Sequence, residues 1–234
     1  MKRLLYLSNG PSKRSVSRLE ERFEACGLTL DLHWAFDNDF PGALDDYCGI
    51  FLSGSPHAAY EDIGFIHREH ELIAEAAQRG LPMLGICFGS QILASSLCGR
   101  DKVFRRPQCE VGYKILVLSP VAVADPLMGT LGSTVRMFVW HNDEVRADHP
   151  EMRILARSDE CLNQIWRFRD LPVWGIQGHP EIDREQALHW FELARPRLEA
   201  DGAVIADLMA DADDAVEAKT MLHAFAQLCL ADER

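Results

Sequence analysis

The sequence has no run of apolar residues long enough to cross a membrane, which needs about 20 such residues for one helix. The apolar run near the N-terminus, residues 4–7, ends at Ser8-Asn9-Gly10. It is too short for a signal peptide and indicates a first strand instead. These patterns predict no membrane partner and a cytoplasmic location.

Basic residues are also scarce, with 24 Lys and Arg against 36 Asp and Glu and a net charge of −12. Such a charge opposes nonspecific binding to nucleic acids and anionic membranes, so we expect no nucleic-acid partner. Hydrophobic residues at 47% and charged residues at 26% are ordinary for a globular protein. The acidity therefore indicates a solvated surface rather than disorder.

Paired metal-binding and nucleotide-binding motifs are missing as well. The cysteines at positions 26, 48, 87, 98, 109, 161 and 229 include no CxxC pair, which excludes the usual zinc and disulfide frameworks. No Gly-x-x-x-x-Gly-Lys-Ser/Thr loop is present to support ATP binding. His67 and His70 have metal-like spacing, but their helix alternates in charge and indicates a solvated face. We expect no metal and no cofactor, and we expect Arg105 and Arg106 at the surface.

Strand and helix patterns alternate in the first half of the chain. Strands are predicted at residues 4–7, 29–34, 49–52 and 82–86, with helices at 16–26, 63–79 and 88–97. The second half predicts strands at 113–118, 135–139, 152–156, 163–168 and 173–177, and helices at 184–194 and 214–230. This order predicts an α/β fold with an open, mostly parallel sheet flanked by helices and a small antiparallel extension. No linker or repeat divides the chain, so we expect a single domain over residues 1–234.

The strongest local motif is GICFGSQ at residues 85–91, where an apolar strand meets a helix. A Gly-x-Cys-x-Gly sequence in this setting is typical of a nucleophile elbow, with Cys87 in place of serine. The sharp turn strains the backbone at the nucleophile, and the flanking glycines remove side chains that would clash. The helix N-terminus favours a thiolate, and the N–H of Phe88 can point at a developing oxyanion. The alternative is a structural cysteine buried in a glycine-rich turn.

A second motif, GIQGHPE at residues 175–181, places His179 and Glu181 at the end of another apolar strand. Residues i and i+2 on an extended segment face the same way, so Glu181 can bond one ring nitrogen of His179 while the other faces the thiol. A lone histidine before proline is more often a solvated or capping residue. Combined with the elbow, it predicts a Cys87-His179-Glu181 triad.

These two motifs together resemble the class-I glutamine amidotransferases, whose glutaminase domain has a flavodoxin-like fold and a Cys-His-Glu triad. The resemblance extends over nearly the whole chain and includes the glutaminase part of GMP synthetase. It implies that LSGSP at residues 52–56 is the oxyanion loop, in which Gly54 contacts substrate and the N–H of Ser55 is the second donor beside Phe88. The family usually has Gly-Gly-Pro here, and a positive φ at this position would strain Ser55.

The resemblance also implies a set of substrate-binding residues. Gln91 corresponds to a residue that contacts bound glutamine. Trp140, His141 and Asn142 correspond to a segment whose backbone holds the amino-acid end of the substrate, although the family often has glycine in place of Asn142. Simple aromatic packing is the alternative for Trp140.

Three functions fit this resemblance. The first and favoured one is a glutaminase that attacks the glutamine side-chain amide through a Cys87 γ-glutamyl thioester and releases ammonia for a separate synthetase partner. The second is a free-standing hydrolase of γ-glutamyl peptides or amides with the same triad. The third, disfavoured by the intact triad, is a non-enzymatic binding domain on the same fold.

Overall fold

The fold is that of a computed structural model, which describes residues 1–11 and 18–231. Its elements in chain order are β1 (Lys2–Leu7), α1 (Leu19–Ala25), β2 (Leu28–His33), η1 (Ala35–Asp37), β3 (Tyr47–Leu52), α2 (Gly64–Gln78), β4 (Met83–Ile86), α3 (Phe88–Leu97), η2 (Arg100–Lys102), β5 (Val103–Leu118), η3 (Pro120–Ala124), β6 (Thr134–Val145), β7 (Met152–Arg157), β8 (Ile165–Phe168), β9 (Val173–Ile176), α4 (Arg184–Leu193), α5 (Arg195–Ala200), α6 (Ile205–Ala210) and α7 (Val216–Ala231).

The described residues form one nine-stranded sheet in the order β2-β1-β3-β4-β9-β8-β7-β5-β6. The strands β2, β1, β3, β4 and β9 are parallel to one another. The strands β8, β7, β5 and β6 continue the sheet in antiparallel pairings. This arrangement confirms the predicted mostly parallel α/β sheet with an antiparallel extension. The carboxyl ends of β1, β3, β4 and β9 therefore meet at one edge.

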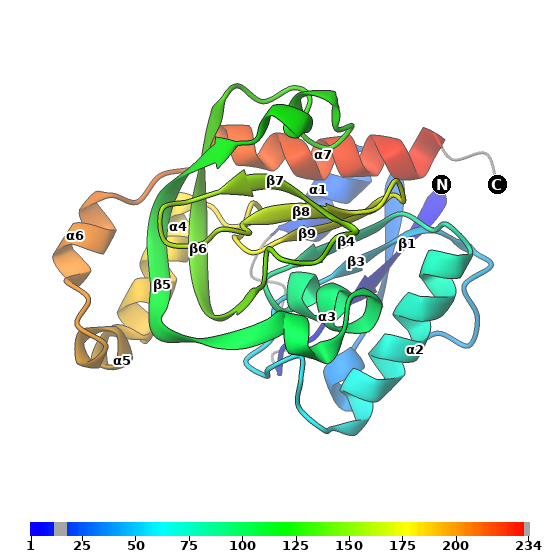
Figure 1. The fold of residues 1–234 in the computed structure, drawn as a ribbon, viewed down its shortest axis with the longest axis horizontal. Coiled ribbons are helices and arrows are strands. Elements are labelled where there is room, and N and C mark those ends of the chain that lie inside the picture. The colour runs from blue at the N-terminus through cyan, green and yellow to red at the C-terminus, as the bar shows by residue number, and fades with distance from the viewer. Residues whose placement is uncertain (12–17, 232–234) are drawn as a thin grey trace.

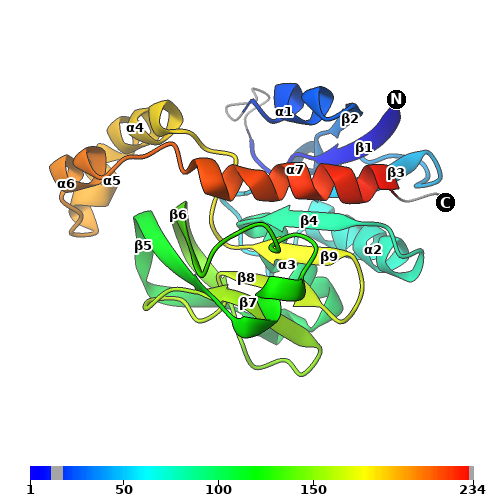
Figure 2. The same cartoon turned by 90° about the horizontal axis from the view of Figure 1, so that it is seen from above.

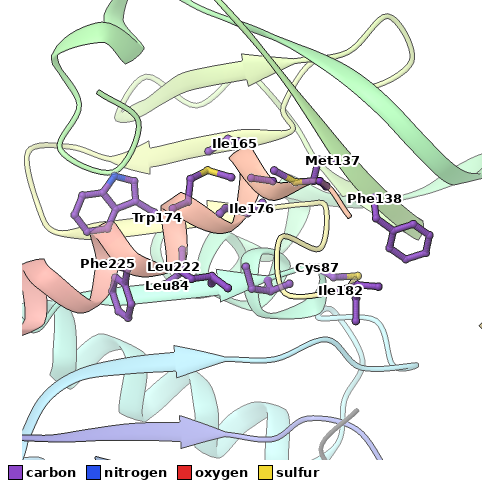
Figure 3. Close-up of a cluster of buried hydrophobic side chains, with 14 of the residues drawn as sticks. Leu84, Cys87, Met137, Phe138, Ile165, Trp174, Ile176, Ile182, Leu222 and Phe225 are labelled. Carbon is purple, nitrogen blue, oxygen red and sulfur yellow. The ribbon is translucent and has the colours of Figure 1, made fainter. Parts of the chain in front are cut away.

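Helices cover both faces of the parallel half (Figures 1 and 2), and an apolar core lies between the helices and the sheet on each face. Side chains alternate along β1, so that Leu4 packs with α1 and α7 while Leu5 packs with α2 and α3. In the first core, buried side chains run from Phe225 and Trp174 at one end to Cys87, Ile182 and Phe138 at the other (Figure 3). The nucleophile thus lies where the core meets the strand-end edge.

The antiparallel half is built on a long β5–β6 ladder. It pairs Val103 with Val145 at one end and Val117 with Thr134 at the other, with an irregularity between Arg105 and Glu110. The predicted strands at 113–118 and 135–139 cover only the apolar part of this ladder. The remainder is polar because it carries a buried ion network, and hydrophobic periodicity does not detect it.

The C-terminal region differs from the prediction. The predicted helix at 184–194 ends at Leu193, and α5 and α6 follow it before α7. Pro196 lies in the first turn of α5, where its missing N–H is tolerated, but it cannot continue α4. The predicted helix at 16–26 corresponds to α1, and its first residue, Val16, lies outside the described residues.

Within residues 1–11 and 18–231, no helix is both long enough and apolar enough to cross a membrane. The longest helix, α7, instead packs its buried residues against α1 and the sheet.

We predict that Gly89→Ala destabilises the fold. A Cβ on Gly89 would lie 2.2 Å from the carbonyl oxygen of Leu52, and that strand backbone cannot move aside without disturbing the sheet. We expect the free energy of unfolding to fall by about 2–3 kcal/mol, in the upper range for overpacking. Urea denaturation measures this change.

The matched control is Gly42→Ala, because a Cβ there meets nothing within 4 Å. Its free energy of unfolding should stay within about 0.5 kcal/mol of wild type. Equal losses in the two variants would contradict the packing argument.

Candidate functional site

Cys87 occupies a strained turn between β4 and α3, with φ 54° and ψ −109°. A side-chain-bearing residue rarely adopts a positive φ, so its surroundings must hold it there. The Cys87 N–H donates to the Ile176 carbonyl at 2.8 Å, which ties the turn to the end of β9. A Cβ on Gly85 would lie 2.3 Å from the backbone of Gly89, so helix and strand approach each other only because both residues are glycine. This geometry is that of a nucleophile elbow.

His179 is held in place by contacts of its ring and of its backbone. Its Nδ1 lies 2.7 Å from Oε1 of Glu181, and its backbone N–H donates to the Phe138 carbonyl at 2.7 Å. Phe138 and Trp190 pack on the ring, each with centroids 5.9 Å away. Because Nδ1 is engaged by Glu181, Nε2 is the ring nitrogen left to hydrogen-bond the Cys87 thiol.

The charge on His179 is set by opposing effects. Burial alone would lower the pKa of this ring, because it disfavours the imidazolium. The Glu181 carboxylate and the hydrogen bonds to Cys87 and Glu181 act in the other direction and raise the pKa of His179 to about 10. The ring therefore holds a proton at neutral pH and can deliver it to a leaving group beside the thiol.

The loop after β3 lies against both reacting side chains. A Cβ on Gly54 would lie 3.7 Å from Cβ of Cys87 and 3.6 Å from Cε1 of His179. Ser55 is not among the described residues with positive φ, so the strain considered for it from the sequence is absent. On the other side of the thiol, Phe88 is the first residue of α3, and its N–H lies among those that have no partner within the helix.

A cavity of about 350 Å³ opens over the thiol. Gly54, Ser55, Cys87, His179 and Glu181 line it, and its walls are Tyr6, Trp140, Asn142, Trp190 and Arg197. Its volume lies at the lower end of the range for small-molecule sites. Three of the wall residues were not found from the sequence, namely Tyr6, Trp190 and Arg197, because nothing in their local patterns marks them.

Only some of the predicted substrate-binding residues face the cavity, because side chains alternate along β6. Trp140 and Asn142 lie on the cavity side of β6, and the Trp140 carbonyl is 3.7 Å from Sγ of Cys87. His141 points to the opposite face, as strand alternation requires. The Gln91 amide is buried and donates to the Asp143 carbonyl at 2.8 Å, so its side chain holds the end of this segment.

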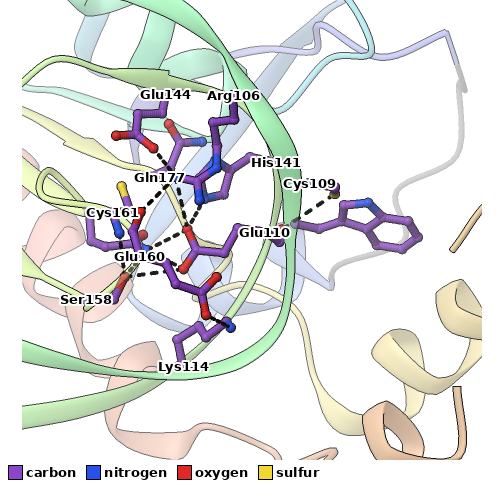
Figure 4. Close-up of polar contacts among 12 residues, drawn as sticks. Arg106, Cys109, Glu110, Lys114, His141, Glu144, Ser158, Glu160, Cys161 and Gln177 are labelled. Carbon is purple, nitrogen blue, oxygen red and sulfur yellow. Dashed lines mark hydrogen bonds and ion pairs between the residues drawn. The ribbon is translucent and has the colours of Figure 1, made fainter. Parts of the chain in front are cut away.

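His141 belongs to a buried ion network behind the cavity (Figure 4). Its Nε2 lies 2.9 Å from Oε2 of Glu110, with both side chains fully buried. Gln164 donates to Oε1 of Glu110 at 3.1 Å, and Arg106 pairs with Glu144 and lies 3.7 Å from Glu110. The expected surface position is thus wrong for Arg106, whose side chain is 12% exposed, whereas Arg105 is exposed. A neighbouring pair of basic residues on a strand faces opposite sides, which explains the difference.

The potential metal ligands in this network are Glu110, His141 and Cys161, whose ligand atoms lie within 4.8 Å of one another. Their chemistry fits a metal poorly. Arg106 already supplies positive charge next to Glu110, and burial raises the pKa of the Cys161 thiol, whereas a metal requires the thiolate. The residues fit an ion network that fixes β6 against β5.

The chain is similar to known proteins in both sequence and fold. The family model described as Glutamine amidotransferase class-I matches residues 12–192. One subunit of the glutamine-hydrolyzing GMP synthase from Halobacterium salinarum is 35% identical over 156 residues, which are 67% of this chain and 76% of that protein. The corresponding protein from Haloarcula marismortui is 33% identical over 167 residues, 71% of this chain and 80% of that protein.

The crystal structure of a glutamine amidotransferase from Thermotoga maritima has the same fold. It superimposes with a TM-score of 0.85 at 21% identity, covering 99% of this chain and 100% of that one. At this identity the similarity concerns the fold alone.

We predict that iodoacetamide modifies Cys87 before the other cysteines. Cys87 lines the open cavity beside His179, whereas burial raises the pKa of Cys98 to about 12 and also raises that of Cys161. Thiolates react, and groups with raised pKa values supply few of them. Peptide mass spectrometry over a time course at neutral pH measures the order.

The control for this experiment is His179→Ala, which should slow labelling of Cys87 and leave that of Cys98 unchanged. Faster modification of Cys98 or Cys161 than of Cys87 in the wild-type protein would contradict the assignment.

Proposed function

The chain belongs to the class-I glutamine amidotransferase family, and we propose that Cys87, His179 and Glu181 are the residues with which it hydrolyses the side-chain amide of glutamine. One observation carries this proposal. Glu181 holds Nδ1 of His179 at 2.7 Å, which leaves Nε2 for the Cys87 thiol, and the three side chains line one open cavity. No metal or cofactor takes part in the proposed steps.

In the first half of the reaction, the Cys87 thiolate attacks the side-chain amide carbon of glutamine. The N–H groups of Ser55 and Phe88 donate to the oxyanion that forms, where fixed donors lower the barrier more than in water. The His179 imidazolium then gives its proton to the amide nitrogen, and the C–N bond breaks. Ammonia leaves, and a γ-glutamyl thioester remains on Cys87.

In the second half, His179 is neutral and accepts a proton from a water molecule that attacks the thioester. The same two N–H groups bind the second oxyanion. When the C–S bond breaks, glutamate departs, and the thiolate and imidazolium are restored. Glu181 keeps the ring oriented and stabilises its charge in both halves.

The relatives named above are subunits of GMP synthases, and we assign this chain a similar place. Ammonia released at Cys87 would pass to a separate synthetase partner, and the full chain, residues 1–234, would form a single glutaminase domain. The described residues contain no disulfide, which suits a reducing compartment, and we assign the protein to the cytoplasm.

A free-standing γ-glutamyl hydrolase is the second candidate, favoured by two side chains in the wall of the cavity. Trp190 of α4 and Arg197 of α5 line the same cavity as Cys87. A guanidinium there can bind an anionic group beyond the scissile amide, such as the carboxylate of a γ-glutamyl amino acid. Glutamine has no group in that position.

We predict that Cys87→Ala abolishes turnover of glutamine while the melting temperature stays close to that of wild type, because a small thiol contributes little packing. His179→Ala should lower kcat by about 10²–10⁴-fold, the usual contribution of acid–base catalysis. Glu181→Gln should lower it less, since the ring remains present. Ammonia release measures all three. Residual turnover in Cys87→Ala near the wild-type rate would refute the mechanism.

The pH dependence gives a second test of Glu181. Its negative charge helps to raise the pKa of His179, so Glu181→Gln should lower that pKa. The imidazolium is the proton donor, and it is lost when pH rises through its pKa. The alkaline limb of kcat should therefore move to lower pH in Glu181→Gln. An unchanged limb would mean that another group causes it.

The two candidate functions differ in how the chain behaves alone. A transfer subunit should hydrolyse glutamine slowly and accelerate when a synthetase partner from a cell extract is added. A hydrolase should reach a kcat/KM above about 10⁴ M⁻¹s⁻¹ for a γ-glutamyl dipeptide without a partner. Arg197→Ala should then lower kcat/KM for the dipeptide and leave that for glutamine unchanged. We expect the first behaviour, and the second result would overturn it.

A further inference from the structure

A glutamate for which the described residues provide no charged partner is buried beneath the oxyanion loop. Glu69 of α2 has no exposed surface, and its Oε1 accepts a hydrogen bond from Nδ2 of Asn9 at 2.9 Å. Asn9, which follows β1, is fully buried as well. Two atoms of this pair have no partner among the described residues, Oε2 of Glu69 and Oδ1 of Asn9.

The orientation of the Asn9 amide follows from its neighbours. Nδ2 donates to Glu69 and also to the Ser53 carbonyl at 3.3 Å. Both partners are acceptors, so the nitrogen must face them and Oδ1 must point elsewhere. If Glu69 were ionised, Oε2 and Oδ1 would be two buried acceptors without a donor, at a cost of about 1–3 kcal/mol each.

A proton on Oε2 removes this conflict. A carboxylic acid and a carboxamide can pair through two hydrogen bonds, one in each direction, and the two atoms without partners are those that the second bond would join. The charged groups near Glu69 on α2 face other partners: His67 pairs with Asp62, and Arg68 pairs with Glu71. None of them neutralises a carboxylate at this position.

Asn9 connects this pair to the catalytic loop. Its backbone N–H donates to Oγ of Ser53 at 2.9 Å, and that hydroxyl donates to the Gly54 carbonyl at 3.1 Å. Gly54 in turn lies against Cys87 and His179. Asn9 thus holds Ser53 by both its backbone and its side chain, two residues before the N–H of Ser55.

We propose that Glu69 is a neutral carboxylic acid paired with Asn9, and that this pair is a positioning element for the loop that carries the oxyanion donor. The second half of the proposal rests on the proposed role of Ser55. Neither Glu69 nor Asn9 lines the cavity, so both act through Ser53.

The protonation state has a consequence for stability. Burial raises the pKa of Glu69 from 4.5 to about 8, and the hydrogen bond from Asn9 offsets this only in part. Between these values the folded state holds a proton that the unfolded state has lost. Stability therefore decreases as pH rises from 4.5 to about 8 and becomes independent of this group above that.

Glu69→Gln tests the neutral acid directly, because a second amide makes the same two hydrogen bonds without a titrating proton. Urea unfolding of this variant and wild type should agree near pH 4.5, and the variant should gain stability over wild type as pH rises towards 8. Glu71→Gln is the matched control, since Glu71 is on the same helix, exposed, and paired with Arg68. It should show no such gain. A constant difference between Glu69→Gln and wild type across this range would overturn the neutral acid.

Activity tests the positioning. Asn9→Ala and Glu69→Leu should lower kcat for glutamine by about 10–10²-fold with little change in KM, because oxyanion donors act mainly in the transition state. Glu69→Gln should restore kcat. A folded Glu69→Leu protein with wild-type kcat would overturn the positioning role.

The protonation state of Glu69 can be tested independently of the proposed function. The pH dependence of unfolding is measured without substrate, so it reports on Glu69 even if Cys87 is not the nucleophile. The infrared band of a protonated carboxyl group, present in wild type at neutral pH and absent in Glu69→Gln, gives the same information without a change in stability. A wild-type spectrum lacking that band would refute the pair.

Discussion

The close approach of α3 to the strands beneath it is the constraint on which the site depends. Gly85 and Gly89 leave no room for a Cβ, and the Cys87 N–H bonds the end of β9. These contacts hold the nucleophile at a positive φ, with its side chain at the end of the first core, where the cavity opens. The backbone strain at Cys87 is therefore stabilised by packing that involves no catalytic side chain. A substitution that moves α3 away from the sheet would therefore release that strain and shift the sulfur of Cys87.

The remaining groups reach the thiol because parallel strands end together. β1, β3, β4 and β9 are neighbours in the sheet, and the segments after them contribute Asn9, Gly54, Cys87 and His179. Open α/β sheets bind ligands at this edge for the same reason. The antiparallel extension adds the outer wall through β6, where Glu110 and His141 fix the strand from behind while Trp140 faces the cavity. The parallel half of the sheet thus brings the reacting groups together, and the antiparallel half forms a wall of the cavity around them.

Much of this could be predicted from sequence, and the limits have a physical cause. The elbow and the His179-Glu181 segment are local, since glycine spacing and i, i+2 geometry appear within a few residues of one chain segment. The alternation of strands and helices likewise predicts the parallel half. Arg106, Trp190 and Arg197 could not be placed, because their positions depend on how segments far apart in sequence pack together. The helix α5 was missed because Pro196 ends the pattern of α4, although proline is tolerated in the first turn of a new helix.

Two glutamates are buried to a similar extent but differ in protonation, because their neighbouring side chains differ. Burial disfavours the ionised form of both Glu69 and Glu110. Glu110 lies beside His141 and Arg106, and these neighbours lower its pKa despite burial, so it remains a carboxylate. Among residues 1–11 and 18–231, the carboxyl group of Glu69 has only the neutral amide of Asn9 as a hydrogen-bond partner, and its pKa is raised. A carboxylate suits the first position because β6 is held there by ionic contacts. A neutral acid suits the second, because it adds no negative charge beneath the loop at which the negative oxyanion must form.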